Sequence, residues 1–134
     1  MLAWFVIKKE GGKAGIMNNC EKIGDTVIIR LPSEVDDYVA TGIIENTREV
    51  FSDKRVKYVI FDFEHTRMMD SSGIGLITRR FRDVYDRKGL VYIINESEQM
   101  KKILTMSGIY RIVNRAADIE EAYAKAHGSF VYQT

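Results

Sequence analysis

The stretch that decides the fold is VKYVIFDF at residues 56–63, followed after a short loop by MDSSGIG at residues 69–75. Residues 56–63 are mostly apolar on both faces, which predicts a central, buried strand. After residue 72 the apolar side chains recur at helical spacing, which predicts an amphipathic helix: Ile74, Ile77, Phe81, Val84 and Tyr85. A polar turn therefore follows the carboxyl end of a buried strand, where open α/β sheets usually meet ligands and partners.

Outside this stretch the chain continues to alternate strands with helices. Residues 26–31 (TVIIRL) and 90–94 (LVYII) predict two more strands, and residues 110–113 predict a short one. Helices are expected from Asp36 or Asp37, after a Ser97 cap and after an Asp118 cap, and Lys88-Gly89 is expected to stop the preceding helix. This order predicts an α/β domain with a mainly parallel sheet of three to five strands.

Composition excludes several classes of function. Twenty Lys and Arg residues stand against 19 Asp and Glu, and the net charge of +1 gives no footprint for nucleic acid or an anionic membrane. Cys20 is the only cysteine, which excludes an internal disulfide and favours an inert thiol in a reducing compartment. The apolar run at residues 2–7 is too short to cross a bilayer, and it lacks a signal-peptide pattern. We expect a cytoplasmic protein.

The polar turn offers two interpretations. Asp70, Ser71 and Ser72 all carry oxygens that can bond the unpaired amides of a first helical turn. Gly73 and Gly75 keep the turn slim, so another backbone could approach it. On these residues alone, a well-capped helix is favoured. A phosphorylated serine here would place about −1.5 to −2 charges beside the positive end of the helix dipole.

Other kinds of site have little support in the sequence. The Gly73-Ile74-Gly75 run lacks the lysine and spacing of a Walker A loop. His65 and His127 stand outside metal-ligand spacing, so no metal site is predicted. The methionines, including Met68 and Met69, are expected mainly in the core, and some near the turn could form an adaptable contact patch.

Two enzyme hypotheses can also be drawn. Asp62 and Glu64 alternate along the predicted strand and could form a carboxylate pair, although solvated charges at a strand end are favoured. A Ser71–His65–Asp62 triad would make a small hydrolase, but no G-x-S-x-G elbow surrounds Ser71. We therefore predict no catalytic residue. On the following helix, Arg79, Arg80 and Arg82 predict a solvated face that could pair with acidic residues of a partner.

Three motifs in order resemble the STAS domain family, of the bacterial anti-sigma-factor-antagonist type. Residues 61–76 (FDF, then MDSSGIGL after the loop) resemble its buried strand, loop and D-S-S-G-h-G-h signature. Residues 30–36 (RLPSEVD) are similar to its L-x-G-E-L-D turn, and residues 106–109 (MSGI) resemble the SGL that ends its third helix. The turn departs from the family pattern at Pro32-Ser33, where the family carries glycine.

The resemblance implies a STAS fold, which is a small, mostly parallel or mixed sheet of four to five strands with about four helices stacked mainly on one side. Residues 16–134 are expected to form one STAS domain. The Gly-rich stretch at residues 10–15 (EGGKAG) predicts that residues 1–15 are an extension, either flexible or a non-native start. The first family strand would fall at residues 16–22, which are poor in β-formers, or at residues 4–8 in their place.

The resemblance also implies a phosphorylation switch without a cofactor. Unphosphorylated protein would bind a GHKL-type anti-sigma serine kinase and free the sigma factor. Phosphorylation of Ser71 would switch it off, a PP2C-type phosphatase would reverse this, and Ser72 is expected to be turned into its helix as a cap. A STAS scaffold or sensory module of a larger signalling assembly is the alternative. The implied partner-binding residues are Glu34, Asp36, Asp70, Ser71, Ser72, Gly73 and Gly75.

Overall fold

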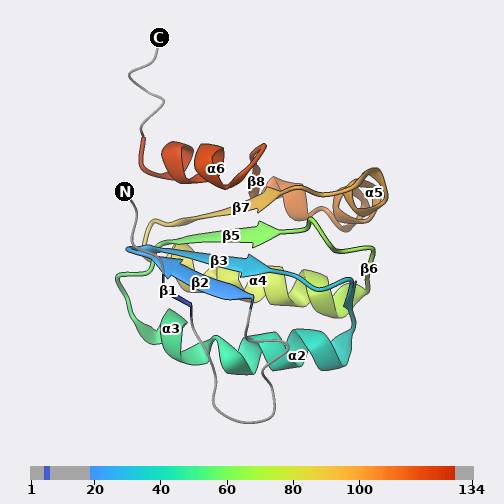
Figure 1. The fold of residues 1–134 in the computed structure, drawn as a ribbon, viewed down its shortest axis with the longest axis horizontal. Helices are drawn as coiled ribbons and strands as arrows, with labels where there is room; N and C mark the ends of the chain where they lie inside the picture. Colours follow the sequence, from blue (N-terminus) through green and yellow to red (C-terminus); the bar gives the residue numbers. More distant parts are fainter. Residues whose placement is uncertain (1–4, 7–18, 129–134) are drawn as a thin grey trace.

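The computed structural model describes residues 5–6 and 19–128. Its main sheet has the strand order β1-β2-β3-β5-β7-β8 (Figure 1). The three inner parallel strands share one register, in which Thr26 pairs with Tyr58 and Tyr58 with Leu90. Strand β2 pairs antiparallel with β3, β1 pairs antiparallel with β2, and β8 pairs parallel with β7. The bounds are β1 (Phe5–Val6), β2 (Cys20–Ile23), β3 (Thr26–Arg30), β5 (Tyr58–Asp62), β7 (Leu90–Ile94) and β8 (Asn114–Arg115).

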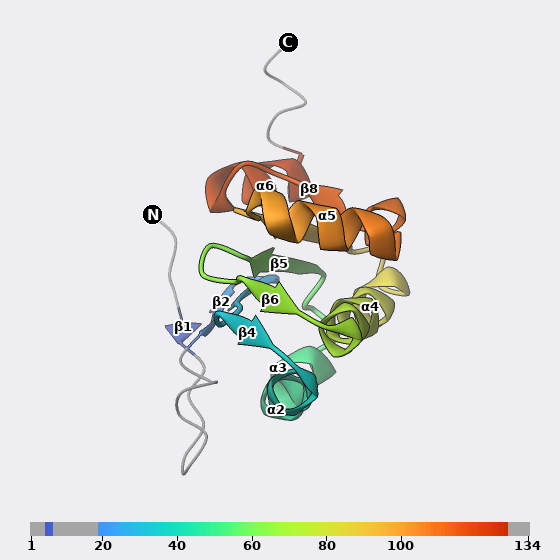
Figure 2. The ribbon, with the colours of Figure 1, turned by 90° about the vertical axis from the view of Figure 1, so that its right-hand side faces the viewer.

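The helices lie unequally on the two faces of this sheet. Helices α2 (Asp37–Asn46), α3 (Arg48–Ser52), α4 (Ser71–Tyr85) and α5 (Glu98–Ser107) contribute side chains to the larger core, while α6 (Ile119–Ala126) packs on the other face. Figure 2 shows α2, α3 and α4 together on the side of β5 away from α6. The predicted α/β class, mixed sheet and one-sided stacking are confirmed. The sheet has four strands of four or five residues, and two-residue strands lie at its edges.

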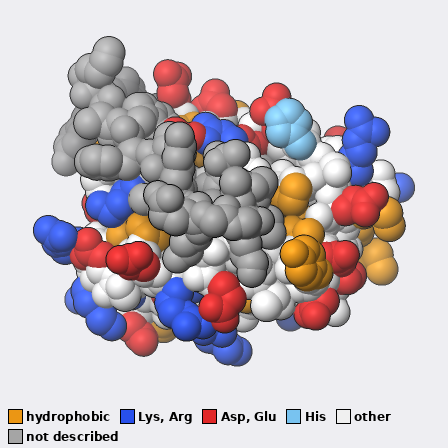
Figure 3. Space-filling view, turned by 60° about the horizontal axis from the view of Figure 1, so that its bottom comes forward, with side chains coloured by type: hydrophobic (Ala, Val, Ile, Leu, Met, Phe, Trp, Pro, Cys, Tyr) orange, Lys and Arg blue, Asp and Glu red, His pale blue; other side chains and the backbone are white. Residues whose placement is uncertain are grey.

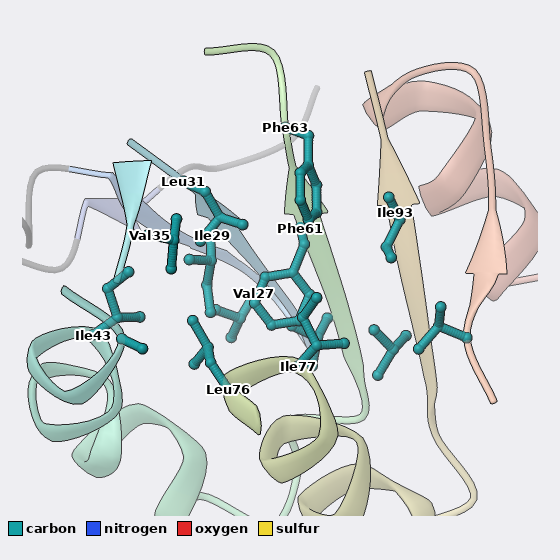
Figure 4. Packing of buried hydrophobic residues seen from close by; sticks show 14 of the residues in the cluster. Val27, Ile29, Leu31, Val35, Ile43, Phe61, Phe63, Leu76, Ile77 and Ile93 are labelled. Atoms are coloured by element: carbon teal, nitrogen blue, oxygen red, sulfur yellow. The ribbon is translucent and has the colours of Figure 1, made fainter. Parts of the chain in front are cut away.

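Alternate residues of the inner strands feed the two cores. In β5, Val59 and Phe61 point into the larger core, and Ile60 points towards α6. Figure 4 shows Val27, Ile29 and Phe61 packed against Leu76 and Ile77 of α4. All five side chains are at most 2% exposed. Burial on both faces explains why the sequence of this strand is apolar at successive positions, and it confirms that prediction.

The prediction of a strand at residues 110–113 is wrong. Residues 110 and 111 lie in the 3-10 helix η1 (Ile109–Arg111), residues 112 and 113 lie in the turn after it, and the strand follows at β8. Gly108, with φ of +81°, ends α5 and begins this turn. Ile109 and Val113 are both buried while Arg111 between them is exposed, which suits a helical turn, whereas a strand would bury all three on one face.

Lys88-Gly89 ends α4, as the sequence predicts. Lys88 is left-handed, with φ of +62°, and the amides of Lys88 and Gly89 donate to the carbonyls of Tyr85 and Val84 at 3.0 and 2.7 Å. A Cβ atom at Gly89 would overlap the carbonyl of Lys57. Glycine is therefore required here because the chain passes close to the start of β5 before it enters β7.

The two candidate positions for the first family strand both carry strands. Strand β2 overlaps the predicted residues 16–22, and β1 lies within residues 4–8. They pair with each other, with Phe5 opposite Lys22. Apart from β1, the expected extension at residues 1–15 lies outside the described residues. A separate two-stranded sheet, formed by β4 (Glu34–Val35) and β6 (Met68–Met69), leads to the candidate site.

Candidate functional site

The two-stranded sheet sets the N-termini of α2 and α4 side by side. Strands β4 and β6 run parallel, with Val35 opposite Met69. The loop before β6 is fixed to the loop before β4, because the amides of Arg67 and Met68 donate to the Ser33 carbonyl at 2.7 and 3.1 Å. Each helix begins one residue after its strand, separated from it only by the cap residue. Both helix N-termini therefore open at the carboxyl edge of the parallel strands, where the sequence analysis expected a partner site (Figure 2).

Aspartates cap both helices, as the sequence predicts. An oxygen of Asp36 accepts from the Val39 amide at 2.9 Å, and an oxygen of Asp70 accepts from the Ser72 amide at 2.8 Å. The expectation that the Ser72 side chain caps its own helix is wrong, because the cap residue is Asp70. Ser72 Oγ donates instead to Asp37 of α2 at 3.2 Å. One serine of the pair is thus used to join the two helices.

The other serine, Ser71, is the first residue of α4 and is exposed. Its hydroxyl has no hydrogen-bond partner within the described part of the chain. It lies at one end of a groove of about 530 Å³ between α2 and α4, which Asp37 and Gly75 also line. A reactant that approached this groove would meet Ser71 with its hydroxyl free.

The two glycines of the motif have different surroundings. Gly73 is buried, and a Cβ atom there would lie 2.7 Å from Met69 Sδ and from Met69 Cε. Gly75 is exposed, and a Cβ atom there would meet nothing within 4 Å. Only Gly75 offers its surface to a second molecule. Gly73 has to be corrected from a contact residue to a packing residue, which lets Met69 lie under the first turn of α4.

The remaining expected site residues lie on one exposed surface around these helix starts. Glu34, Asp36 and Met68 line a hollow of about 130 Å³ that ends at Asp70. The side chain of Met68 is 59% exposed, in agreement with a methionine contact patch near the turn, whereas Met69 is buried. The sequence analysis missed Tyr38, which is 73% exposed in the first turn of α2. Its position off the apolar stripe of that helix was the available signal.

The hydrolase triad is not assembled in the structure. Asp62 is buried and accepts from Asn95 Nδ2 at 3.0 Å and from the Glu64 amide at 2.9 Å, and its other oxygen lies 3.7 Å from Arg30 Nε. Strand β5 ends at Asp62, so Glu64 lies in the following turn and the two carboxylates do not alternate along one strand as expected. His65 is exposed in the same turn, and no described residue links it to Ser71.

Cys20 and Arg80 are both buried, and neither offers a reactive group to solvent. Burial raises the pKa of the Cys20 thiol to about 12, with Arg80 opposing the shift, so the thiol stays protonated at neutral pH. Arg80 was expected on a solvated face, which is wrong, because its side chain is 4% exposed. Its guanidinium bonds Asp83, the Ile44 carbonyl and Thr47 Oγ1 at 2.7, 2.9 and 2.7 Å, and burial lowers its pKa.

The described ranges, 5–6 and 19–128, contain no group of three or more His, Cys, Asp or Glu side chains placed to hold a metal ion. None of the helices within them combines the length and the apolar character needed to cross a membrane.

Comparison with known proteins agrees with this geometry. The sequence model of the STAS domain matches residues 18–122. The chain is similar to the anti-sigma F factor antagonist of Lysinibacillus sphaericus, with 32% identity over 85 residues, which are 63% of this chain and 73% of the relative. It is also similar to a solved anti-sigma factor antagonist, SpoIIAA in its unphosphorylated form. That likeness has a TM-score of 0.66 and 29% identity, and covers 81% of this chain and 96% of the other.

A second solved relative is the Bacillus cell fate determinant SpoIIAA in its phosphorylated form. It has a TM-score of 0.60 and 32% identity, and the likeness covers 75% of this chain and 90% of the relative. The match of the family model spans most of the described fold, including β4, β6 and the starts of both α2 and α4. The chain therefore belongs to the STAS domain family.

Proposed function

We propose that this protein is an anti-sigma-factor antagonist whose activity is switched by phosphorylation of Ser71. In the unphosphorylated state it binds a GHKL-type serine kinase that acts as an anti-sigma factor, and the sigma factor is released. Curated relatives from Lysinibacillus sphaericus and Paenibacillus polymyxa carry the name anti-sigma F factor antagonist, which supports this role. A PP2C-type phosphatase resets the switch. We place the protein in the cytoplasm, with residues 16–134 as one STAS domain.

The observation that carries the proposal is the difference between the two neighbouring serines. Ser71 is exposed with a hydroxyl free of protein partners in the described structure, whereas Ser72 is half-buried and donates to Asp37. A kinase needs a hydroxyl that can enter its active site without breaking an existing contact. A solved relative 32% identical to this chain is described in a phosphorylated form, which supports a phosphorylatable residue in this fold.

The proposed switch acts at the interface and leaves the fold in place. A phosphate on Ser71 would lie beside the first amides of α4, which favour an anion. It would also lie on the surface formed by Glu34, Asp36, Asp70, Ser72 and Gly75, where we place the partner. A partner docked over this surface would have to desolvate the new dianion, and that cost weakens binding.

The protein acts by binding, without catalysis and without a cofactor. A serine nucleophile needs a general base within hydrogen-bond reach, and Ser71 has none among the residues that the structure describes. We therefore expect a fluorophosphonate probe to leave Ser71 unlabelled. Covalent labelling at this residue would contradict a purely regulatory role.

The experiment that tests the proposal is phosphorylation by the anti-sigma kinase of the same genome. Incubation with that kinase and ATP, followed by mass spectrometry, should place one phosphate on Ser71. Ser71→Ala should abolish modification and still bind the kinase, and Ser72→Ala serves as the matched control that is still phosphorylated. Phosphate found only on Ser72, or no complex with the kinase, would refute the proposal.

A further inference from the structure

A cluster of basic side chains lies at the far end of the groove that begins at Ser71. The groove between α2 and α4 continues into a second hollow of about 250 Å³, and the two share Ile44 and Arg79. Five cationic side chains and one carboxylate line this second hollow: Arg48, Lys54, Arg79, Arg80, Arg87 and Asp83. The groove thus passes from a serine-bearing, acidic end to a basic one.

Two of these cations hold the fold together and offer little to a ligand. Arg80 bonds α2, Thr47 and Asp83, and its guanidinium lies 4.4 Å from the centre of the Phe51 ring. Arg87 donates to the carbonyls of Phe51, Val56 and Asp53 at 2.7, 2.9 and 3.1 Å. Their hydrogen bonds explain why the α3 segment stays fixed to α4. A small anion inside the hollow would compete with these bonds.

Other cations around the groove are exposed and available. Lys54, Arg79 and Arg82 are exposed, and none of them has an ion pair with another of the described residues. We call these three residues the basic end. Arg48 is a weaker candidate because it pairs with Glu45 at 2.8 Å. Available charge on an exposed rim suits a macromolecular partner better than an enclosed small ligand.

The basic end is within reach of a partner that covers Ser71. Arg79 follows Ser71 by eight residues of α4, and at 1.5 Å per residue this is about 12 Å along the helix. Ser71, Gly75 and Arg79 recur every four residues and line the same groove. A typical interface buries about 800 Å² on each partner, which corresponds to a disc with a radius of roughly 16 Å. A footprint centred on Ser71 therefore covers Arg79 and ends close to Arg82, which lies about 16.5 Å along the helix.

The charges at the two ends of the groove have opposite sign. Asp36, Asp37 and Asp70 lie at the start of α2 and α4. In the basic end, Arg79 and Arg82 lie past the middle of α4 and Lys54 follows α3. Figure 3 shows hydrophobic and acidic side chains towards the right of this face, and basic side chains interspersed with acidic ones towards its left and lower edge. Such a charge arrangement favours one orientation of a partner and disfavours the reverse.

We propose that the partner docking at Ser71 lays an acidic segment along the groove between α2 and α4, with its carboxylates against the basic end. This inference rests on the proposed function, and it adds the chemistry of the partner and the direction in which it lies. The acidic segment meets Arg79 first and Arg82 and Lys54 beyond it. Its role is to orient the partner, so that the active site of the kinase is held over Ser71.

Charge reversal at the basic end tests this inference. The double variant Arg79→Glu/Arg82→Glu should bind the anti-sigma kinase of the same genome about tenfold more weakly at 50 mM salt. Raising the salt to 300 mM should weaken wild-type binding and reduce the difference between the two proteins. The control is Arg111→Glu, an exposed arginine of η1 beside the edge strand β8, which should bind as wild type does. Circular dichroism should show the same fold for all three proteins.

The outcomes separate this inference from the function on which it rests. Equal affinity of the double variant and the wild type at 50 mM salt would overturn the acidic segment and leave the antagonist role intact. An equal loss in Arg111→Glu would also overturn it, because the effect would then come from net charge alone. If wild-type protein forms no complex with the kinase at either salt concentration, the proposed function itself fails.

Discussion

Helices α2 and α4 begin in the same way and differ in the residue that follows the cap. Asp36 has φ of −102° and ψ of −172°, and Asp70 has φ of −101° and ψ of −171°. Each cap follows a two-residue strand of the same small sheet. The next residue is Asp37 in α2 and Ser71 in α4. One helix thus carries a permanent carboxylate where the other carries a hydroxyl.

This comparison shows what a charge on Ser71 would do to the fold. At α2 the structure already accommodates an anion in the first helical turn, where the helix dipole favours it. The backbone at α4 has the same geometry, so a phosphate there meets a helix start of the same kind. The effect of the switch should therefore appear in partner binding and not in the folded structure.

The largest expected effect is on the affinity of the phosphorylated protein for its kinase partner. Phosphate on Ser71 should weaken binding on the order of 100-fold or more, because a dianion is desolvated at the interface. The melting temperature should change by only about 2 °C, since the dipole of α4 offsets repulsion from Asp70 and Asp37. Calorimetry of both forms measures the affinity, and amide NMR should confine the shifts to the starts of α2 and α4. Shifts across the whole sheet would contradict the comparison.

Variants at Gly73 and Gly75 test whether one glycine packs while the other faces the groove. Gly73→Ala should lower the free energy of unfolding by about 1–3 kcal/mol, because its Cβ atom displaces Met69. Gly75→Ala has open space around the new methyl group and should raise stability by about 1 kcal/mol through helix propensity. Urea denaturation measures both. Equal destabilisation by the two variants would show that the buried position is not special.

The sequence predicted most of the fold because its signals are local. Three kinds of signal each depend on a few neighbouring residues. They are the apolar run at residues 56–63, the apolar stripe of α4, and the helix caps at Asp36, Asp70, Ser97 and Asp118. The strand expected at residues 110–113 failed because a short apolar segment can form a strand or a helical turn. This segment forms a helical turn because Gly108 starts the turn and because Ile109 and Val113 are buried against the larger core.

The site was harder to predict because its important contacts join distant segments. Ser72 and Asp37 are 35 residues apart, and Arg80 and Thr47 are 33 apart. No local pattern shows that Ser72 is bound across the groove, or that Arg80 is buried while its neighbour Arg79 is exposed. Those assignments follow only when β4 and β6 bring α2 against α4. The sequence motif predicted the correct segment, but only the tertiary structure shows that Ser71 is exposed and that Ser72 is bonded to Asp37.

Removal of each cap tests whether the two helix starts are energetically alike. Asp36→Ala and Asp70→Ala should each lower the free energy of unfolding by about 1 kcal/mol, since each leaves one helix amide unpaired. Asn retains a capping oxygen, so Asp36→Asn and Asp70→Asn are matched controls that should lose only a few tenths of this. Chemical denaturation measures all four variants. A cost at Asp70 that is several times that at Asp36 would indicate that the two starts are not equivalent.

The smallest expected effect comes from breaking the bond that joins the two helix starts. Ser72 Oγ donates to Asp37 Oδ1 at 3.2 Å on an exposed surface, so Ser72→Ala should cost about 0.5 kcal/mol of stability or less. A double-mutant cycle with Asp37→Ala isolates the coupling between the two side chains, which should be favourable and of similar size. A coupling of zero would mean that the bond does not form in solution. Ser72 would then present a free hydroxyl like that of Ser71, and the structural reason for choosing between the two serines would be lost.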